Sequence, residues 1–154
     1  MNRRSLLAGV AASSAAIAGC ASIEATVFQE STAPEVPSDP DDPIARATIG
    51  ASSDDSPHRI RLWNRTDDQR SIGLDLEAET ATFEGNYDLA SDAHVVIVLH
   101  DRAEYAVTVT VDGDEIESTT LEAESFDDPC PATELFVLED DEFEMTTESE
   151  SDHC

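Results

Sequence analysis

The chain has 154 residues, enough for one small domain, and its 35 acidic and eight basic side chains give a formal net charge of −27 at pH 7. All eight basic residues are arginines, and so acidic a chain excludes nucleic acid as a direct partner, because that binding requires basic side chains that release phosphate counterions. With six glycines, no Gly-x-Ser-x-Gly and no phosphate-cradling glycine loop, the sequence carries no hydrolase or nucleotide-binding signature.

Residues 1–19 have the pattern of a removable export signal. They contain Arg3 and Arg4, no acidic residue, and a modestly apolar stretch from Leu6 to Ala18. At 13 residues this stretch is too short to cross a hydrocarbon core of about 30 Å, which needs about 20 helical residues. The alternative, an amphipathic or buried N-terminal helix, suits an Arg-Arg start without acids poorly.

Two motifs specify the export route and the anchor. Asn2-Arg3-Arg4-Ser5-Leu6-Leu7 resembles the twin-arginine motif, which implies export of an already folded protein. Ile17-Ala18-Gly19-Cys20 resembles a lipobox, in which the cysteine is lipidated and becomes the mature N-terminus. These resemblances imply a protein held by lipid on the external face of the cell membrane. Since one lipid chain binds only marginally, firm anchoring needs two chains or a second contact.

The acidic composition has a physical consequence. Loss of residues 1–19 removes two arginines and takes the formal net charge from −27 to −29. Repulsion of this size is screened in molar salt, where the Debye length is about 3 Å. The composition resembles that of proteins from salt-loving archaea, and with residues 1–20 the chain resembles small haloarchaeal lipoproteins. A calcium-binding surface and a surface for a basic partner are the alternatives. The acids spread from Glu24 to Asp152 rather than gathering in ligand loops, which favours general surface adaptation.

Residues 20–57 are predicted to form a flexible, acidic linker rich in Pro, Ser, Asp and Glu. Within it, Glu35–Pro43 has three prolines in seven residues, which deny the backbone a helix or an inner strand. This segment is typical of a stalk that holds a domain off a membrane. Ile44–Ile49 is an alternative first strand, which would move the domain boundary by about ten residues.

Residues 58–154 are predicted to form an all-β domain, a single immunoglobulin-like β-sandwich of about seven to eight strands. Ser71–Glu77 and Tyr105–Val111 alternate apolar and polar residues, and Asp112-Gly113 predicts a hairpin turn. His94–His100 is continuously apolar inside, as expected of a strand covered on both faces. The Cys-Trp-Cys spacing of a true immunoglobulin domain is absent, so the likeness stops at the architecture. The other predicted strands are Arg59–Asn64, Thr80–Glu84, Glu115–Leu121, Glu134–Glu139 and Phe143–Thr147.

With Cys20 assigned to the lipid anchor, Cys130 and Cys154 are the two cysteines that remain. Outside the cell, an even number of cysteines favours a disulfide, here between Cys130 and Cys154. It would close a loop of about 24 residues and contribute roughly 3 kcal/mol on the chain-entropy model.

The histidines do not predict a metal site. His94 and His100 would lie roughly 20 Å apart on one strand, too far to share an ion. A site of His153, Cys154 and one distant histidine is conceivable. Copper-binding sandwich proteins, however, carry a Cys followed closely by His and Met, whereas Cys130 precedes Pro131-Ala132-Thr133. No metal and no cofactor is therefore expected.

The sequence predicts no catalytic residue. Acidic pairs such as Asp127-Asp128 and Asp140-Asp141 could serve a glycosidase, but among 35 acids such pairs arise by chance, and these fall in expected turns. We expect a protein that is not an enzyme.

Two further residues are candidates for contacts at the surface. Asn64-Arg65-Thr66 is a sequon for N-linked sugar, and the alternative is an asparagine that simply ends a strand. Trp63 falls on the opposite face of its strand from Ile60 and Leu62, and a tryptophan in such a position most often packs in the core or at its rim. If exposed, it is the first choice for a contact residue.

Together these features predict a lipid-anchored, extracellular β-sandwich that acts as a non-enzymatic binding or cell-envelope module in a halophile. A metal-binding or electron-carrier sandwich of the copper type is one alternative, and an accessory subunit of a membrane complex is another.

Overall fold

The computed structural model describes residues 42–52 and 56–149. The predicted signal over residues 1–19, Cys20, most of the predicted linker, His153 and Cys154 lie outside the described residues, so the predictions made for them stay predictions. None of the described residues belongs to a helix that is long and apolar enough to span a membrane.

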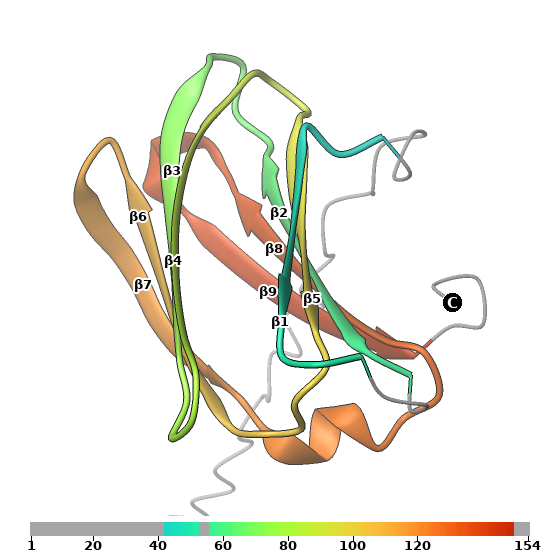
Figure 1. Ribbon diagram of the computed structural model, residues 1–154. Helices are drawn as coiled ribbons and strands as arrows, with labels where there is room; N and C mark the ends of the chain where they lie inside the picture. Colours follow the sequence, from blue (N-terminus) through green and yellow to red (C-terminus); the bar gives the residue numbers. More distant parts are fainter. Residues whose placement is uncertain (1–41, 53–55, 150–154) are drawn as a thin grey trace, which may run out of the picture. The chain divides into compact units, whose positions relative to one another are not determined.

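The described residues form two packed sheets, and the all-β sandwich is confirmed (Figure 1). One sheet has five strands in the order β1-β5-β2-β8-β9, and the other has four in the order β4-β3-β6-β7. This order differs from the ABED and CFG sheets of an immunoglobulin constant domain, so the likeness is limited to the two-layer architecture. The strands are β1 (Ala45–Ile49), β2 (His58–Asn64), β3 (Arg70–Glu77), β4 (Thr82–Leu89), β5 (His94–Leu99), β6 (Tyr105–Val111), β7 (Asp114–Leu121), β8 (Pro131–Val137) and β9 (Phe143–Ser149).

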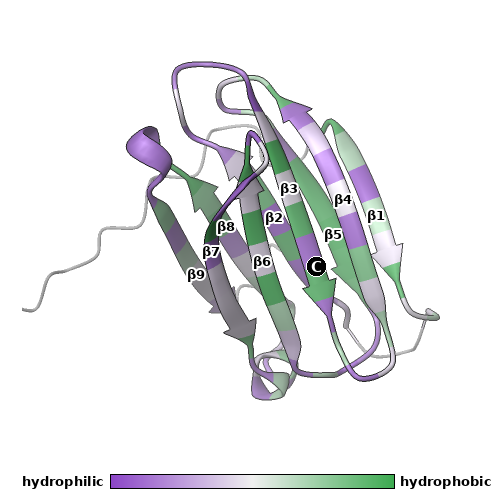
Figure 2. Ribbon diagram, turned by 90° about the vertical axis from the view of Figure 1, so that its left-hand side faces the viewer, coloured by the Kyte–Doolittle hydropathy of each residue, from purple (hydrophilic) through white to green (hydrophobic). Residues whose placement is uncertain are grey.

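The core lies between the sheets and follows the period of two in the sequence. Figure 2 shows hydrophobic and hydrophilic residues alternating along β3 and β4. The predicted inward residues of β3 and β6 are fully or almost fully buried: Ile72, Leu74, Leu76, Tyr105, Val107, Val109 and Val111. The five-stranded sheet adds Ile60 and Leu62 from β2, Leu135 and Val137 from β8, and alternate residues of β5.

The predicted hairpin between β6 and β7 is confirmed. Asp112 and Gly113 have φ of 53° and 94°, and Val111 pairs with Asp114. A two-residue turn with positive φ at both positions matches the right-handed twist of the strands it joins, which explains why Asp-Gly is preferred here.

Two predicted boundaries are wrong. The sandwich begins before residue 58, because β1 pairs in parallel with β5 and packs Ala45, Ala47 and Ile49 against the core. The predicted linker over residues 20–57 therefore includes an edge strand, and the alternative of a first strand at Ile44–Ile49 is confirmed as β1. The strand predicted at Thr80–Glu84 extends as β4 to Leu89, because it pairs along the whole of β3.

Two short 3-10 helices, η1 (Ala123–Phe126) and η2 (Glu139–Asp141), were not predicted. Each connects strands at an end of the sandwich, and each adjoins or contains one of the acidic pairs noted above. Asp140 and Asp141 both have positive φ, so this pair builds a turn.

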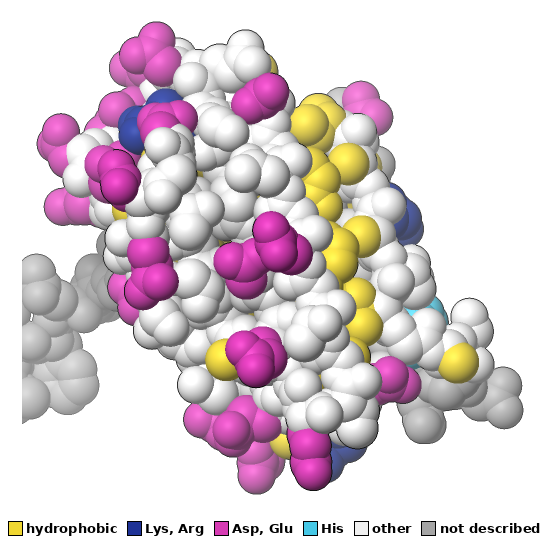
Figure 3. All heavy atoms as spheres, turned by 60° about the vertical axis from the view of Figure 1, so that its left-hand side comes forward, with side chains coloured by type: hydrophobic (Ala, Val, Ile, Leu, Met, Phe, Trp, Pro, Cys, Tyr) yellow, Lys and Arg dark blue, Asp and Glu magenta, His cyan; other side chains and the backbone are white. Residues whose placement is uncertain are grey.

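The outward-facing sides of the two sheets differ in kind. Figure 3 shows acidic side chains spread over the four-stranded sheet, where Glu77, Glu84 and Asp88 are exposed. The side of the five-stranded sheet that faces away from the core, called here the outer face, carries buried apolar and paired charged side chains instead.

Candidate functional site

The outer face brings together four side chains, called here the outer-face cluster: Arg61, Trp63, His94 and Glu134. They come from β2, β5 and β8, and each is at most 6 % exposed. Because Ile60 and Leu62 of β2 point into the core, strand alternation directs Arg61 and Trp63 to the opposite side. The neighbours Val96, Val98, Ala132 and Phe136 are at most 8 % exposed and make the surroundings apolar.

An ion pair holds the centre of the cluster. Arg61 Nη1 donates to Glu134 Oε1 at 2.7 Å, and the two side chains are 8 % and 4 % exposed. The parallel register of β2 and β8 places Arg61 directly beside Glu134. Trp63 Nε1 donates to Glu134 Oε2, so both carboxylate oxygens are engaged. Buried charges require such pairing, since an unpaired one loses its hydration without compensation.

An aromatic stack completes the cluster. The rings of Trp63 and His94 lie 3.9 Å apart between centroids at an interplanar angle of 20°, because the two residues are register partners on β2 and β5. Trp63 is packed in the interior, as expected for core or rim packing, and because its exposed fraction is 0 % the condition on which it was a candidate contact residue is not met. In chemical terms the cluster is a buried ion pair beside an aromatic stack, an arrangement that suits packing.

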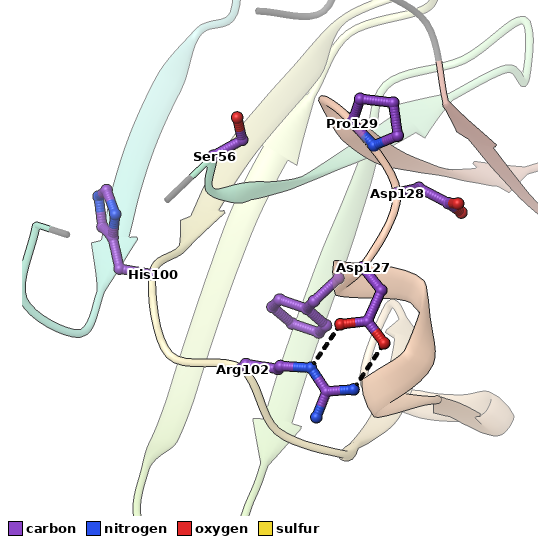
Figure 4. Close-up of a pocket in the computed structure, with 7 residues that line it drawn as sticks. Ser56, His100, Arg102, Asp127, Asp128 and Pro129 are labelled. Atoms are coloured by element: carbon purple, nitrogen blue, oxygen red, sulfur yellow. Dashed lines mark hydrogen bonds and ion pairs between the residues drawn. The ribbon is translucent and has the colours of Figure 1, made fainter. Parts of the chain in front are cut away.

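A cavity of about 460 Å³ opens at one end of the sandwich, beside η1 (Figure 4). Its lining residues are Ser56, His100, Arg102, Phe126, Asp127, Asp128 and Pro129. Arg102 donates from Nε and Nη2 to the two oxygens of Asp127 at 2.8 and 2.7 Å. These hydrogen bonds hold the pKa of the Asp127 carboxyl below its ordinary value.

The cavity contains residue types that hydrolases use, but not their arrangement. Ser56, His100 and Asp128 all line it. In a catalytic triad a carboxylate holds one imidazole nitrogen so that the other can accept the proton of the serine. His100 Nδ1 is buried without a hydrogen-bond partner, and the hydrogen bonds drawn in Figure 4 are those of Arg102 with Asp127. The described geometry does not assemble a proton relay.

A third position is His58, which begins β2 and contacts Phe126 of the cavity lining. Its ring packs 4.8 Å from that of Phe126, and Nε2 lies 2.8 Å from Thr133 Oγ1, which in turn contacts Thr147 Oγ1 at 2.9 Å. Burial lowers the pKa of His58 from 6.5 to about 4, against a smaller opposing effect of the Ser125 backbone. His58 is therefore a neutral packing residue at pH 7.

The histidines that the sequence singled out lie apart. His94 begins β5 and stacks on Trp63, whereas His100 follows that strand and lines the end cavity. In the part of the chain that the structure describes, no group of three or more His, Cys, Asp or Glu side chains is placed to hold a metal ion. The alternative site with His153 and Cys154 falls outside that part.

Cys130 precedes β8 at a half-buried position with φ of 51°, a backbone conformation that favours glycine. Its predicted partner, Cys154, lies outside the described residues, so the disulfide between them stays a prediction.

Asn64 ends β2 and is fully buried. Its Nδ2 donates to the carbonyls of Asp68 and Leu89, each at 2.8 Å, and its Oδ1 accepts from the backbone N–H and the hydroxyl of Thr66. The sequon residues thus build an Asx turn in which the whole amide is satisfied. This geometry supports the strand-ending role and leaves the acceptor nitrogen for sugar inaccessible in the folded chain.

We predict that Asn64 carries no sugar in the folded protein, because its buried Nδ2 donates to two backbone carbonyls and is not free for a transferase. Mass spectrometry of the peptide containing residues 62–65 should find the unmodified mass. Asn64→Ala should cost about 1–3 kcal/mol for each buried group left unpaired, measured by urea unfolding in molar KCl. A glycopeptide at Asn64 would contradict this prediction.

The two charged members of the cluster were missed by sequence reasoning. Each interrupts an apolar strand at an outward position: Arg61 among Ile60, Leu62 and Trp63, and Glu134 in the run from Pro131 to Val137. Two opposite charges in otherwise buried strands are the signal that could have suggested a pair. The sequence matches no protein-family model and no curated protein.

Proposed function

We propose that the protein is a lipid-anchored, extracellular β-sandwich that serves as a non-enzymatic binding or cell-envelope module of a salt-adapted cell. Residues 1–20 support the export and the anchor through the twin-arginine and lipobox motifs. The acidic four-stranded face supports the salt-adapted setting, since its charges lie at exposed positions such as Glu77 and Glu84.

The non-enzymatic part of the proposal rests on the contacts that the described histidines and the buried glutamate make. His58 packs on Phe126, His94 stacks on Trp63, and Glu134 is held by Arg61 and Trp63. Each group serves the interior of the sandwich instead of facing a cavity where a substrate could reach it. A scaffold whose His58, His94 and Glu134 are engaged in packing, and whose end cavity brings Ser56, His100 and Asp128 together without a proton relay between them, suits display and binding better than catalysis.

The anchor is tested with Cys20→Ser in the native host. We expect the wild-type protein in the membrane fraction with a lipid label, and the variant in the medium without one, because the sulfur is the attachment point. Immunoblots of the membrane fraction and of the medium give the share of the protein in each. Replacement of Arg3 and Arg4 by lysine is the control and should keep the precursor inside the cell. A Cys20→Ser protein that stays on the membrane would overturn the anchor.

The binding role is tested by purifying the wild-type protein from salt-stable detergent extracts and by metal analysis of the mature chain refolded in high salt. A partner recovered in a fixed ratio would identify what the module binds or which complex it joins. Stoichiometric copper would instead overturn the proposal in favour of an electron carrier.

A further inference from the structure

Two edge strands, β1 and β4, lie on the same side of the sandwich. Figure 2 shows them next to each other, with β7 and β9 on the opposite side. Among the described strands, β1 pairs with β5 alone and β4 pairs with β3 alone. The free edge of such a strand presents a row of backbone donors and acceptors that can bind another strand. This side of the sandwich, called here the open side, is therefore a candidate interaction surface.

The open side is also apolar. Figure 3 shows a stripe of hydrophobic side chains along it, beside the acidic four-stranded face. The stripe stays open because two of the three inward side chains of β1 are single methyl groups and Gly85 interrupts those of β4. Burying such surface in a second molecule removes it from water and favours association. The two strands contribute partly buried apolar residues that pack against the core: Ala45, Ala47, Ile49, Phe83 and Tyr87.

The outward-facing residues of these two strands are complementary in charge. Arg46 of β1 is exposed and makes no ion pair with any of the described residues. At the outward positions of β4, Glu84 and Asp88 are exposed. Two copies of β1 side by side would bring arginine to arginine, and two copies of β4 would bring acid to acid. Pairing of β1 with β4 brings opposite charges together, which stabilises neighbouring strands.

We propose that two copies of this chain associate through their open sides, with β1 of each copy paired to β4 of the other. The arrows of β1 and β4 point in opposite directions in Figure 2, so a two-fold axis parallel to the strands makes both pairs antiparallel.

Strand alternation makes the two contacts consistent. It places the inward residues of β1 next to those of β4, so that the two apolar cores become continuous, and it places Arg46 among the acids of the outward face. Because both strand pairs form at once, the interface is closed and assembly stops at the dimer.

The opposite side of the sandwich is protected against the same kind of pairing. The register of β7 with β6 shifts between Val109 and Thr110, and an irregular edge pairs poorly with a new strand. The registers of β1 with β5 and of β4 with β3 are continuous. Edge strands β7 and β9 carry only acidic charges, which would repel each other across an interface: Asp114, Glu115, Glu117, Glu144 and Glu148.

The dimer has a consequence for the membrane. The inference itself concerns the folded chain and does not depend on the proposed anchor. Where that anchor holds, two copies carry two lipidated Cys20 residues, which supplies the second attachment that firm membrane binding requires. The acidic faces of the two four-stranded sheets would then be displayed together.

The test measures the mass of the full chain in molar KCl by sedimentation velocity. Cys20→Ser is the common background, so that no lipid adds to the mass. We expect twice the mass of one chain at micromolar concentration. Arg46→Glu should raise the dissociation constant of the dimer about tenfold or more, because each of two symmetric contacts exchanges an attraction for a repulsion.

Reversal of the acids separates a specific contact from a general effect of charge. Glu84→Arg with Asp88→Arg should weaken the dimer as Arg46→Glu does, although it makes the chain less negative. Addition of Arg46→Glu to this variant restores opposite charges and should recover most of the affinity. The matched control reverses two exposed acids of the opposite edges, Glu115→Arg with Glu148→Arg, and should not weaken the dimer.

A cross-link gives a second measurement on a chain whose charges are native. A photo-crosslinker replaces the exposed Thr48 of β1 in an equal mixture of isotopically light and heavy chains. Cross-links between copies to β4 are expected, and circular dichroism should show that every charge variant keeps the fold. A monomeric parent chain, equal weakening by the β4 and control variants, failure of the combined variant to recover affinity, or cross-links between copies confined to β7 or β9 would each overturn the proposal.

Discussion

Glu134→Ala should destabilise the folded chain by about 3–5 kcal/mol, the usual cost of removing one partner from a buried ion pair. Arg61 would keep a charge that is 8 % exposed and has lost its carboxylate, and the Trp63 N–H would lose its acceptor. Since small domains are stable by about 5–15 kcal/mol, the variant should be partly unfolded or close to it. Urea unfolding in molar KCl, followed by Trp63 fluorescence, measures the difference.

A double variant separates the cost of removing one charge from the net contribution of the pair. Arg61→Met with Glu134→Leu replaces both charges by apolar side chains of similar size, in an environment already formed by Val96, Ala132 and Phe136. The free energy of unfolding of this double variant should be much closer to that of the wild type than the value for Glu134→Ala is. The exposed Glu148 of β9 offers a control, and Glu148→Ala should change stability by less than about 0.5 kcal/mol. A loss below about 1 kcal/mol for Glu134→Ala would show that the carboxylate is not buried and paired as described.

The stability of the protein should fall as the pH is lowered from about 6.5 to about 4, in part because of His58. Its pKa is about 4 in the folded chain against 6.5 for the free side chain. Between these values the unfolded chain binds a proton that the folded chain does not, so stability rises with pH across this window. The contribution is fully present above the unfolded pKa and is lost as the pH falls through the folded pKa. A shift of this size corresponds to about 3 kcal/mol.

Carboxylates also titrate in this range, so the contribution of His58 is obtained by difference. His58→Gln keeps a polar group near Thr133 and removes the titration. The stability of wild type relative to this variant should therefore decline between pH 6.5 and 4 and level off below. NMR titration of the His58 ring should give a pKa near 4 in the folded chain and near 6.5 in urea. A folded-state value near 6.5 would show that the ring is not buried as described.

Local sequence patterns determined most of the strands for a simple physical reason. Alternation with a period of two places Ile72, Leu74 and Leu76 on one side whatever else the chain does, and Asp112-Gly113 turns the chain with only its own backbone freedom. The apolar interior of His94–Leu99 predicted a strand covered on both faces, and both faces are buried.

The predicted strand boundaries are wrong at β1 and at the end of β4, where a strand forms because it pairs with a neighbouring strand and not because of its local sequence pattern. β1 is held in the sheet by parallel pairing with β5, a partner about fifty residues away, and its small inward side chains Ala45 and Ala47 give a weak signal. The second half of β4 is a strand because it follows β3 in register, although Asn86 and Asp88 are polar.

The sequence by itself determined the all-β class, the local strand and turn geometry, and the residues on which the expectation of export and anchoring rests. Only the tertiary structure decided that Trp63 is buried, that Asn64 builds a turn, and that Arg61 neutralises Glu134. Arg61 and Glu134 are 73 residues apart in the chain and become neighbours through the order and register of β2 and β8. Such contacts depend on which strands lie side by side, and local periodicity carries no record of that choice.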